Sequence, residues 1–375
     1  MLVKQGDDRM IRRFIAAIAL AVLSVVGLTR ALQAADIRVL DTEHREELDS
    51  YPNMPNNLRD IVCNLSLKGI IEQGDLQKIK AAIDEKFSVR RSENFSVRLC
   101  LDSEGGNYLE ALDIAEFLMG QYIGTGLKRE AICASSCAVI FMAGTRLIDG
   151  WVGPMRDEGF DRFMHPSSTL AFHAPYLDLE GMESTPINTR WAKLAELYND
   201  GVMATRRLTA MAMGAELRFP MELLAEMLTK GPKETYVINT VGKVTRYRID
   251  LFDVAVPSFE TPAFCHACAN RLYPDEFSCD LDGEDPQIRS QVQSLKRFRS
   301  GRRVEFMPGA SSNPCVIDVE VIGQTIKGWF LRPDLRYRDQ RSSRGDFGSK
   351  SSEARPLPYW YLYDPDTLLS TIEQR

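Results

Sequence analysis

The chain has 375 residues, of which 44% are hydrophobic and 26% charged, and a formal net charge of −6 at pH 7. This composition is typical of a soluble globular protein and allows a core of good size. The acidic balance argues against a general nucleic-acid binder. The length leaves room for two domains, or for one domain with extensions.

The first 35 residues have the pattern of a secretory signal peptide. Arg12 and Arg13 precede an apolar run over residues 14–28, and small residues follow at 31–35. The run is shorter than the roughly 20 residues that a membrane span needs, and small residues suit a cleavage site. We therefore predict export to the periplasm or the medium, with the mature chain beginning near Ala35 or Asp36. An uncleaved anchor and a buried helix are the alternatives.

Eight cysteines accompany this signal, four in the first half of the chain and four in its last third. In an exported protein such cysteines predict disulfide bonds, and each half can close its own pairs. The spacing does not choose the partners. Cys265 and Cys268 also resemble half of a zinc site, although no second close pair follows, so we expect disulfides and no metal. The eight are Cys63, Cys100, Cys133, Cys137, Cys265, Cys268, Cys279 and Cys315.

Strands alternate with helices after a predicted linker over residues 36–57. Such alternation predicts parallel βαβ units and an α/β fold over residues 58–255. A loop-like insertion rich in Gly and Pro occupies 149–168. We expect strands at 61–71, 97–101, 125–133, 169–172, 236–239 and 244–249, and helices from 75, at 107–119, from 136, at 187–213 and at 221–229.

The composition changes after Pro257. We expect a small, Cys-rich, mostly β domain over residues 256–335, with a half-buried strand at 315–323 where apolar and polar residues alternate. The stretch 328–335 resembles the closing strand of bacterial SH3-like barrels. Residues 336–375 begin with a run rich in Arg, Ser, Gly and Asp, which predicts a flexible tail.

Three stretches carry the candidate chemistry. Residues 132–144 run from a strand into an apolar helix through small residues that include Ser136. A strand that turns into a helix over small side chains lets a reacting group approach the backbone closely. Upstream, a strand ends in Gly105 and Gly106 before another helix. Downstream, a short strand ends in His173.

This order of strand–Gly-Gly–helix, Ser-containing turn and strand–His resembles the Clp protease/crotonase superfamily. The closest likeness is to Clp-protease-like and signal-peptide-peptidase-like serine peptidases. The resemblance implies that Ser136 is the nucleophile and His173 its base. It also implies an oxyanion hole formed by Gly105 or Gly106 together with the backbone N–H of Cys137.

The resemblance also implies an acidic third member of the triad, for which Glu234 is the nearest match. Asp200 fits less well, and a Ser-His dyad without an acid is the third option. His165 is a rival base, but it lies in the predicted insertion.

Each candidate also has a structural interpretation. Ser136 resembles a helix N-cap, and the two glycines resemble a simple turn. A lone His in an apolar strand is commonly a core residue. The thiol of Cys137 at a helix N-terminus would suit a nucleophile, but export favours its pairing.

Taken together, the sequence predicts an exported serine hydrolase, a peptidase acting on a peptide or protein, with no cofactor. A catalytically silent scaffold whose C-terminal module binds a protein or envelope partner is the alternative. Crotonase-type acyl-CoA chemistry and an ATPase partner are not expected outside the cytoplasm. No nucleic-acid partner is expected, and a homo-oligomer is left open.

Overall fold

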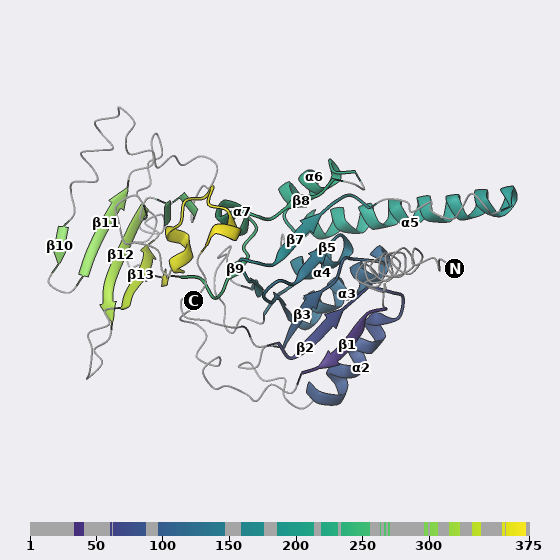
Figure 1. Ribbon diagram of the computed structural model, residues 1–375, viewed down its shortest axis with the longest axis horizontal. Helices are drawn as coiled ribbons and strands as arrows, with labels where there is room; N and C mark the ends of the chain where they lie inside the picture. Colours follow the sequence, from purple (N-terminus) through teal and green to yellow (C-terminus); the bar gives the residue numbers. More distant parts are fainter. Residues whose placement is uncertain are drawn as a thin grey trace, which may run out of the picture.

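The computed structural model describes residues 34–40, 61, 63–87, 97–146, 159–175, 186–213, 219–231, 234–255, five positions within 263–270, and 358–372. Between 296 and 356 it describes the backbone of five strands. The protein is a mixed α/β structure with a mostly parallel central sheet, as the sequence predicts (Figure 1).

Six strands form the central sheet in the order β1-β2-β3-β4-β6-β9. The edge strand β1 is antiparallel to β2, and the other neighbours are parallel. Parallel neighbours need crossover connections, which helices α2 and α3 supply. The strands are β1 (Asp36–Val39), β2 (Leu65–Lys68), β3 (Arg98–Asp102), β4 (Gly124–Leu127), β6 (Arg162–Met164) and β9 (Asp250–Leu251).

Local sequence explains the two crossover helices. Helix α2 (Asp75–Phe87) begins at an acidic residue, which suits the positive end of the helix dipole. Helix α3 (Tyr108–Gln121) begins after Asn107, whose side chain accepts a hydrogen bond from the Glu110 N–H at 3.0 Å. Its apolar face is fully buried through Ala111, Leu112, Ile114, Ala115 and Leu118. Burial of that face fixes α3 against the sheet.

A second, three-stranded sheet contains β5 (Ile132–Ala134), β7 (Thr169–Phe172) and β8 (Tyr236–Val237). β5 and β7 are parallel, and β7 and β8 are antiparallel. A single parallel bridge between Ser103 and Cys133 joins this sheet to the end of β3. The buried helix α4 (Ser136–Met142) follows β5 directly. Helices α5 (Ile187–Met213) and α6 (Met221–Leu228) then lead to β8.

Three predicted elements differ from the structure. The predicted linker begins with β1, and the predicted insertion contains β6. The single strand expected over 125–133 is two strands in different sheets, because the exposed charged residues 128–130 form a turn with Glu130 at φ 60°.

The strand expected over 244–249 is instead helix α7 (Val241–Arg246). The side chain of Thr240 caps this helix by accepting from the Lys243 N–H at 3.3 Å. Val244, which belongs to the expected strand, is instead buried together with Val241 on one face of a helical turn. The cap and this burial therefore outweigh β propensity.

The C-terminal part of the chain contains a five-stranded antiparallel sheet, β10-β11-β12-β13-β14. Its β12 confirms the strand expected at 315–323, and β13 extends past the predicted end of this region at 335. The strands are β10 (Lys296–Phe298), β11 (Gly301–Phe306), β12 (Cys315–Ile322), β13 (Arg332–Arg338) and β14 (Arg355–Pro356).

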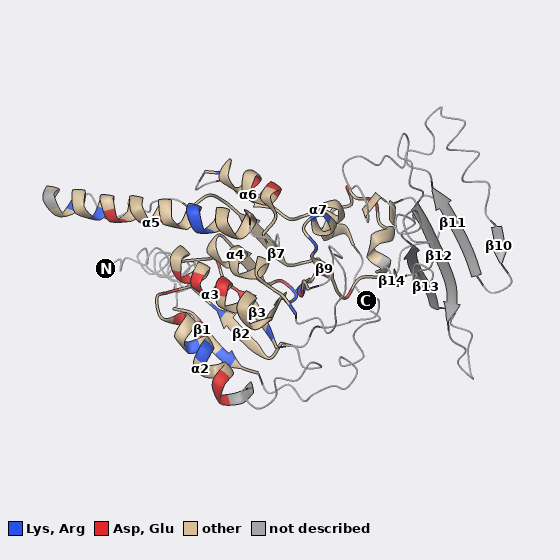
Figure 2. Cartoon of the chain, turned by 180° about the vertical axis from the view of Figure 1, so that it is seen from behind, with Lys and Arg blue, Asp and Glu red and all other residues tan. Residues whose placement is uncertain are grey.

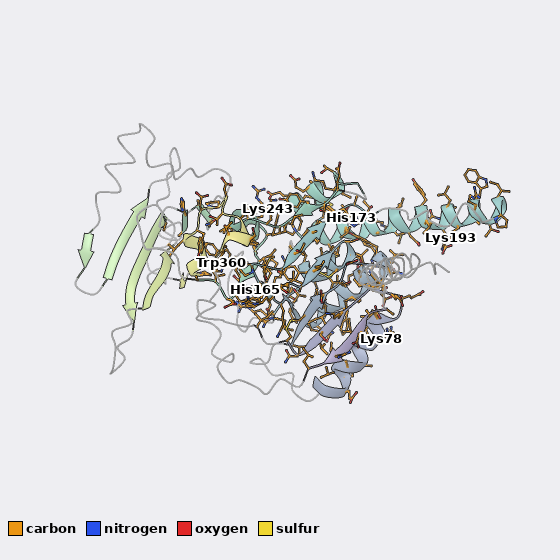
Figure 3. The ribbon with its side chains drawn as sticks, in the orientation of Figure 1. Lys78, His165, His173, Lys193, Lys243 and Trp360 are labelled. Atoms are coloured by element: carbon orange, nitrogen blue, oxygen red, sulfur yellow. A yellow bond between two sulfur atoms is a disulfide. The ribbon has the colours of Figure 1, made fainter. Side chains whose placement is uncertain are left out.

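Residues 358–372 return to the α/β core, which corrects the prediction of a flexible tail for that segment. The short helices η4 (Tyr359–Leu362) and η5 (Leu369–Thr371) bury Trp360 and Leu369 in the main hydrophobic cluster. The Leu369 N–H donates to the Asn239 carbonyl at 2.9 Å. Figure 3 shows Trp360 in this C-terminal segment. In the sequence, a run of polar residues precedes position 358. The buried apolar residues that follow it are therefore not recognisable as part of the core.

The cysteines of the first half pair among themselves, as predicted. Cys63 is bonded to Cys100, and Cys133 to Cys137. Disulfides persist in oxidising compartments, so both bonds agree with the predicted export. Cys265, Cys268 and Cys279 lie outside the described residues, as do the side chain of Cys315 and the predicted signal over 1–33.

Among the described residues, no helix has the length and apolarity that crossing a membrane requires.

A buried ion pair joins β3 to the segment that enters β6. The Arg98 Nη2 lies 2.6 Å from Asp161 Oδ1, and both side chains are more than nine-tenths buried. The guanidinium also stacks over Phe163, 4.6 Å from the ring centroid. Removing one partner from such a pair leaves an uncompensated buried charge, which is much more costly than losing a surface pair.

We therefore expect Asp161→Asn to lower the free energy of unfolding by about 3–5 kcal/mol in urea denaturation. The matched control is Glu196→Gln, which removes the solvent-exposed pair between Lys193 and Glu196 and should change stability little. Equal effects of the two variants would contradict the importance of the buried pair.

Candidate functional site

The turn between β5 and α4 is held by backbone hydrogen bonds on both sides of Ser135. The Ser135 N–H donates to the Ala171 carbonyl of β7 at 2.9 Å, and its carbonyl accepts from the Ala138 N–H at 3.0 Å. The Ser135 backbone has φ 57° and ψ −127°, a conformation that residues other than glycine rarely adopt. Such strain costs about 1–3 kcal/mol and concentrates at functional sites. The half-buried Ser135 therefore stands at a sharp, strained strand-to-helix turn.

Ser136, the predicted nucleophile, is the first residue of α4 and is fully buried. Its Oγ has no hydrogen-bond partner in the described part of the chain. All seven residues of this helix are buried, so the side chain faces packed protein. A substrate cannot reach this hydroxyl without local rearrangement.

Gly105 and Gly106 lie against this turn. Both have positive φ, 113° and 142°. A Cβ added to Gly105 would lie 2.8 Å from the Cβ of Ser135, which is closer than real Cβ atoms approach. A Cβ on Gly106 would meet the backbone of Ile71. Glycine at 105 therefore allows the loop to pass this close to Ser135, and glycine at 106 allows it to pair closely with Ile71.

The hydrogen bonds around Ile71 determine where the Gly106 N–H points. The Ile71 N–H donates to the Gly105 carbonyl at 2.9 Å, and the Ile71 carbonyl accepts from Asn107 at 2.8 Å. In a parallel ladder this pattern turns the N–H of the intervening residue to the opposite edge. The segment containing Cys133 pairs on that edge, at Ser103.

The N–H of Gly106 therefore faces the side of the Ser135 turn, and it has no partner among the described residues. The Gly105 N–H is already used, since it donates to the Ser103 Oγ at 3.1 Å. Of the two predicted donors, Gly106 is thus the one available.

His173 directly follows β7 and is buried. Its Nδ1 lies 2.8 Å from the Ala174 carbonyl oxygen. A carbonyl can only accept, so Nδ1 carries the proton of the neutral ring and Nε2 is the basic nitrogen. The parallel register pairs Ala134 with Ala171, and its continuation brings the Ser135–Ser136 turn alongside Phe172 and His173. His173 is not hydrogen-bonded to either serine in this structure.

Glu234 does not orient His173 in this arrangement. Its side chain is exposed and makes no hydrogen bond or ion pair with a described residue. The loop that carries it is nevertheless close, because the Lys230 carbonyl accepts from the Ala174 N–H at 3.2 Å. Asp200 lies in α5 and also makes no ion pair with a described residue. At His173 Nδ1 the structure places the Ala174 carbonyl oxygen, and neither Glu234 nor Asp200.

His165, the rival base, lies well apart from His173 (Figure 3). Its Nε2 is 3.3 Å from Asp253 Oδ2, and its Nδ1 accepts from the Ser167 N–H at 3.1 Å. Asp253 is also paired with Arg129 at 2.6 Å. The ring is buried and packs edge-on against Phe252. These contacts anchor the segment after β6 to the segment after β9, which is a structural role.

The disulfide between Cys133 and Cys137 encloses both serines. The two Cα atoms are 5.2 Å apart, and one cysteine lies on β5 and the other on α4. In the bonded form Cys137 has no thiolate, so the alternative of a cysteine nucleophile does not apply to this structure. Its bond instead restrains the turn that presents Ser135.

Ser135 is a candidate that the sequence alone does not distinguish from its neighbour. The pattern Ser135-Ser136 offers two hydroxyls, and the predicted helix start drew attention to the second. The usable signal was position, because the residue immediately before the helix occupies the sharp turn and is the one left partly exposed.

Among the described residues, no group of three or more His, Cys, Asp or Glu side chains is arranged to hold a metal ion. Comparison with protein families finds no family model that matches the chain, and no curated protein matches it either.

The close approach of the loop to Ser135 predicts a position-specific cost. Gly105→Ala should lower the free energy of unfolding by roughly 1–3 kcal/mol, because it adds backbone strain and a clash with Ser135. Gly120→Ala in α3 is the control, since a Cβ there meets nothing within 4 Å and helix propensity favours Ala. Equal stability of the two variants in urea denaturation would refute this account of the loop.

Proposed function

We propose that the protein is a serine hydrolase, and specifically a peptidase of the Clp protease/crotonase-like superfamily, in which Ser135 is the nucleophile. The observation that carries this proposal is the contact between the strained, partly exposed Ser135 and the Gly105–Gly106 loop. Small residues, a strained turn and unpaired backbone donors occur together at this point. This replaces Ser136 as the expected nucleophile.

The proposed chemistry assigns one role to each group. Ser135 Oγ attacks the carbonyl carbon of the substrate, and His173 Nε2 takes the hydroxyl proton and returns it to the leaving group. The N–H groups of Gly106 and Ser136 stabilise the negative charge on the carbonyl oxygen. The Ala174 carbonyl holds the imidazole in the tautomer that this role requires.

The absence of a hydrogen bond between Ser135 and His173 is compatible with this assignment. Catalytic hydrogen bonds in free enzymes are often long and shorten when substrate binds. The two parallel strands that carry the residues are paired directly, so a small rotation of either side chain changes their separation. The proposal therefore describes a Ser-His dyad oriented by a backbone carbonyl.

The fold supports the family assignment through its parallel sheet and its order of motifs along the chain. The two disulfides support a periplasmic or secreted location. In such a compartment the enzyme would act on peptide or protein substrates without an ATPase partner or a cofactor.

A catalytically silent scaffold is the second candidate, in which the C-terminal module binds a protein or envelope partner. The buried Ser136 hydroxyl and the missing link between His173 and either serine favour it. The two candidates differ in the reactivity of Ser135.

A fluorophosphonate probe tests this reactivity. The wild-type protein should be labelled at Ser135, and Ser135→Ala should abolish labelling. His173→Ala should slow labelling by at least about 10²-fold, because the general base is lost. The labelled residue is identified by peptide mass spectrometry.

Ser136→Ala is the matched control. It removes a buried hydroxyl without a partner, so it should retain labelling and should not lower stability. If Ser136→Ala loses labelling while Ser135→Ala keeps it, the assignment of the nucleophile is wrong. If the folded wild type takes up no probe at any pH between about 6 and 9, the scaffold replaces the hydrolase.

A further inference from the structure

The disulfide between Cys133 and Cys137 spans the segment that carries the proposed nucleophile. One cysteine lies on β5 and the other on α4, and both are fully buried. Ser135 lies between them with φ 57°. The bond therefore closes a short covalent ring around the strained residue.

The hydroxyl of Ser135 does not have the role that a serine at this position ordinarily has. Ser135 is the N-cap residue of α4, yet its side chain makes no capping hydrogen bond. A serine that caps a helix typically has an extended backbone, and its hydroxyl accepts from an N–H two or three residues later. Here those donors are Cys137 and Ala138. In such an unstrained conformation the hydroxyl oxygen would be bonded to the helix and not presented to a substrate.

The two sides of the turn are restrained differently. On the strand side, β5 pairs with β7, and the Ser135 N–H donates to the Ala171 carbonyl at 2.9 Å. On the helix side, α4 begins without a side-chain cap. The Cys133–Cys137 bond joins this uncapped start of the helix to the paired strand. It therefore favours the strained conformation of Ser135 over the capping one.

This segment contains no charged side chain. Residues 132–142 include no Lys, Arg, Asp or Glu, and Figure 2 shows α4 entirely in tan. Protonation of an acidic or basic side chain within the segment therefore cannot control the turn. Oxidation of the two thiols can control it, because this reaction changes the covalent connection between the strand and the helix.

We infer that formation of the Cys133–Cys137 disulfide places Ser135 in its reactive conformation, so that the protein becomes a hydrolase only after oxidation. This inference rests on the proposed function and names the regulation of that site. In the reduced chain, Ser135 relaxes to the capping conformation. Its hydroxyl is then withdrawn from substrate and from His173.

The oxidant is a protein that carries an exchangeable disulfide. The thiolate of one cysteine attacks a sulfur of that disulfide and forms a mixed disulfide, and one oxidant thiol is released. The second thiolate then attacks the mixed disulfide, which forms the Cys133–Cys137 bond and releases the other oxidant thiol. The oxidant is thereby reduced to a dithiol, and it takes up the two protons that the cysteines lose.

Burial of both sulfurs protects the bond once the protein is folded. A reductant must reach a sulfur atom, and both cysteines are 0% exposed. The bond therefore forms before α4 is packed, during folding in an oxidising compartment. Cytoplasmic thiols are kept reduced, so a chain that has not yet been exported would hold Ser135 unreactive. Proteins of the compartment in which the chain is made would thus escape cleavage.

The disulfide between Cys63 and Cys100 provides a matched control. It joins residues 37 apart in the chain, and it lies in a small hydrophobic cluster separate from the main one that contains Cys133 and Cys137. In the chain-entropy account, the stabilisation from a disulfide grows with the length of the loop that it closes. We therefore expect the Cys63–Cys100 bond to contribute more to stability and the Cys133–Cys137 bond more to reactivity.

Two double variants of the exported full chain separate these effects. Cys133→Ala/Cys137→Ala should lower the maximal rate of fluorophosphonate labelling at Ser135 by roughly 5- to 150-fold, because the strained conformation loses its restraint. The pH dependence of the remaining labelling should stay that of the wild type, since His173 is untouched. Cys63→Ala/Cys100→Ala should keep the wild-type labelling rate, and it should be the less stable of the two variants in urea.

Refolding tests the dependence on oxidation, because the sulfurs are shielded in the folded protein. Wild type that is unfolded with a reductant and refolded in its presence should be labelled slowly. Refolding with glutathione disulfide should restore the original rate. The Cys133→Ala/Cys137→Ala variant retains every other cysteine, and it should be labelled slowly under both conditions. Cys133→Val/Cys137→Ala, which refills part of the buried volume, takes its place if it does not fold.

The outcomes distinguish this inference from the proposed function. If the oxidised wild type and the folded Cys133→Ala/Cys137→Ala variant are labelled at equal rates, the inference is overturned and the hydrolase stands. An oxidised wild type that takes up no probe overturns the hydrolase instead. A crystal structure of the variant then decides the conformational part. Ser135 should have a negative φ and a hydroxyl bonded to the start of α4, and a φ still near 57° would overturn the inference.

Discussion

The three-residue strand β5 determines the arrangement of the candidate site, because it is hydrogen-bonded along both edges. On one edge it meets Ser103 at the end of β3, and on the other it pairs in parallel with β7. The Gly105–Gly106 loop follows β3, and His173 follows β7. Since parallel strands end at the same edge of a sheet, all three chemical elements lie where β5 ends. A shift in the register of β5 would move the Ser135 turn away from both the Gly105–Gly106 loop and His173.

The long, periodic elements of the α/β region could be predicted from the sequence. Helix α5 has the bounds that its pattern indicates, and β3 and α3 differ from expectation by a residue or two. The errors fall where tertiary contacts outweigh local preference. Thr240 caps α7 in a run rich in β-branched residues, and a turn of exposed charges divides β4 from β5. Trp360 could not be recognised as a core residue because its partners are far away in the chain.

The sequence indicates the turn of the candidate site, but it does not choose between the two serines in that turn. The hydroxyls of two adjacent serines have equivalent chemistry. The positive φ of Ser135 cannot be inferred from the types of residue around it. The structure separates them by burial, since Ser136 is buried as the first residue of α4 and Ser135 is only half-buried. The Cys133–Cys137 disulfide lies across this strained turn. Strain of this kind persists only where surrounding bonds over-determine the backbone, and here a covalent bond adds to the hydrogen bonds of β5.

The return of residues 358–372 to the core has a consequence for biosynthesis. The Val241 N–H donates to the Thr367 carbonyl at 3.1 Å, and Ile372 packs in the same cluster as strands made much earlier. A nascent chain therefore cannot complete the α/β core until residue 372 has left the ribosome. The antiparallel sheet from β10 to β14 lies between two pieces of one domain in the sequence. A premature stop codon within that sheet would thus damage the α/β domain encoded upstream, and not merely delete the module in which it falls.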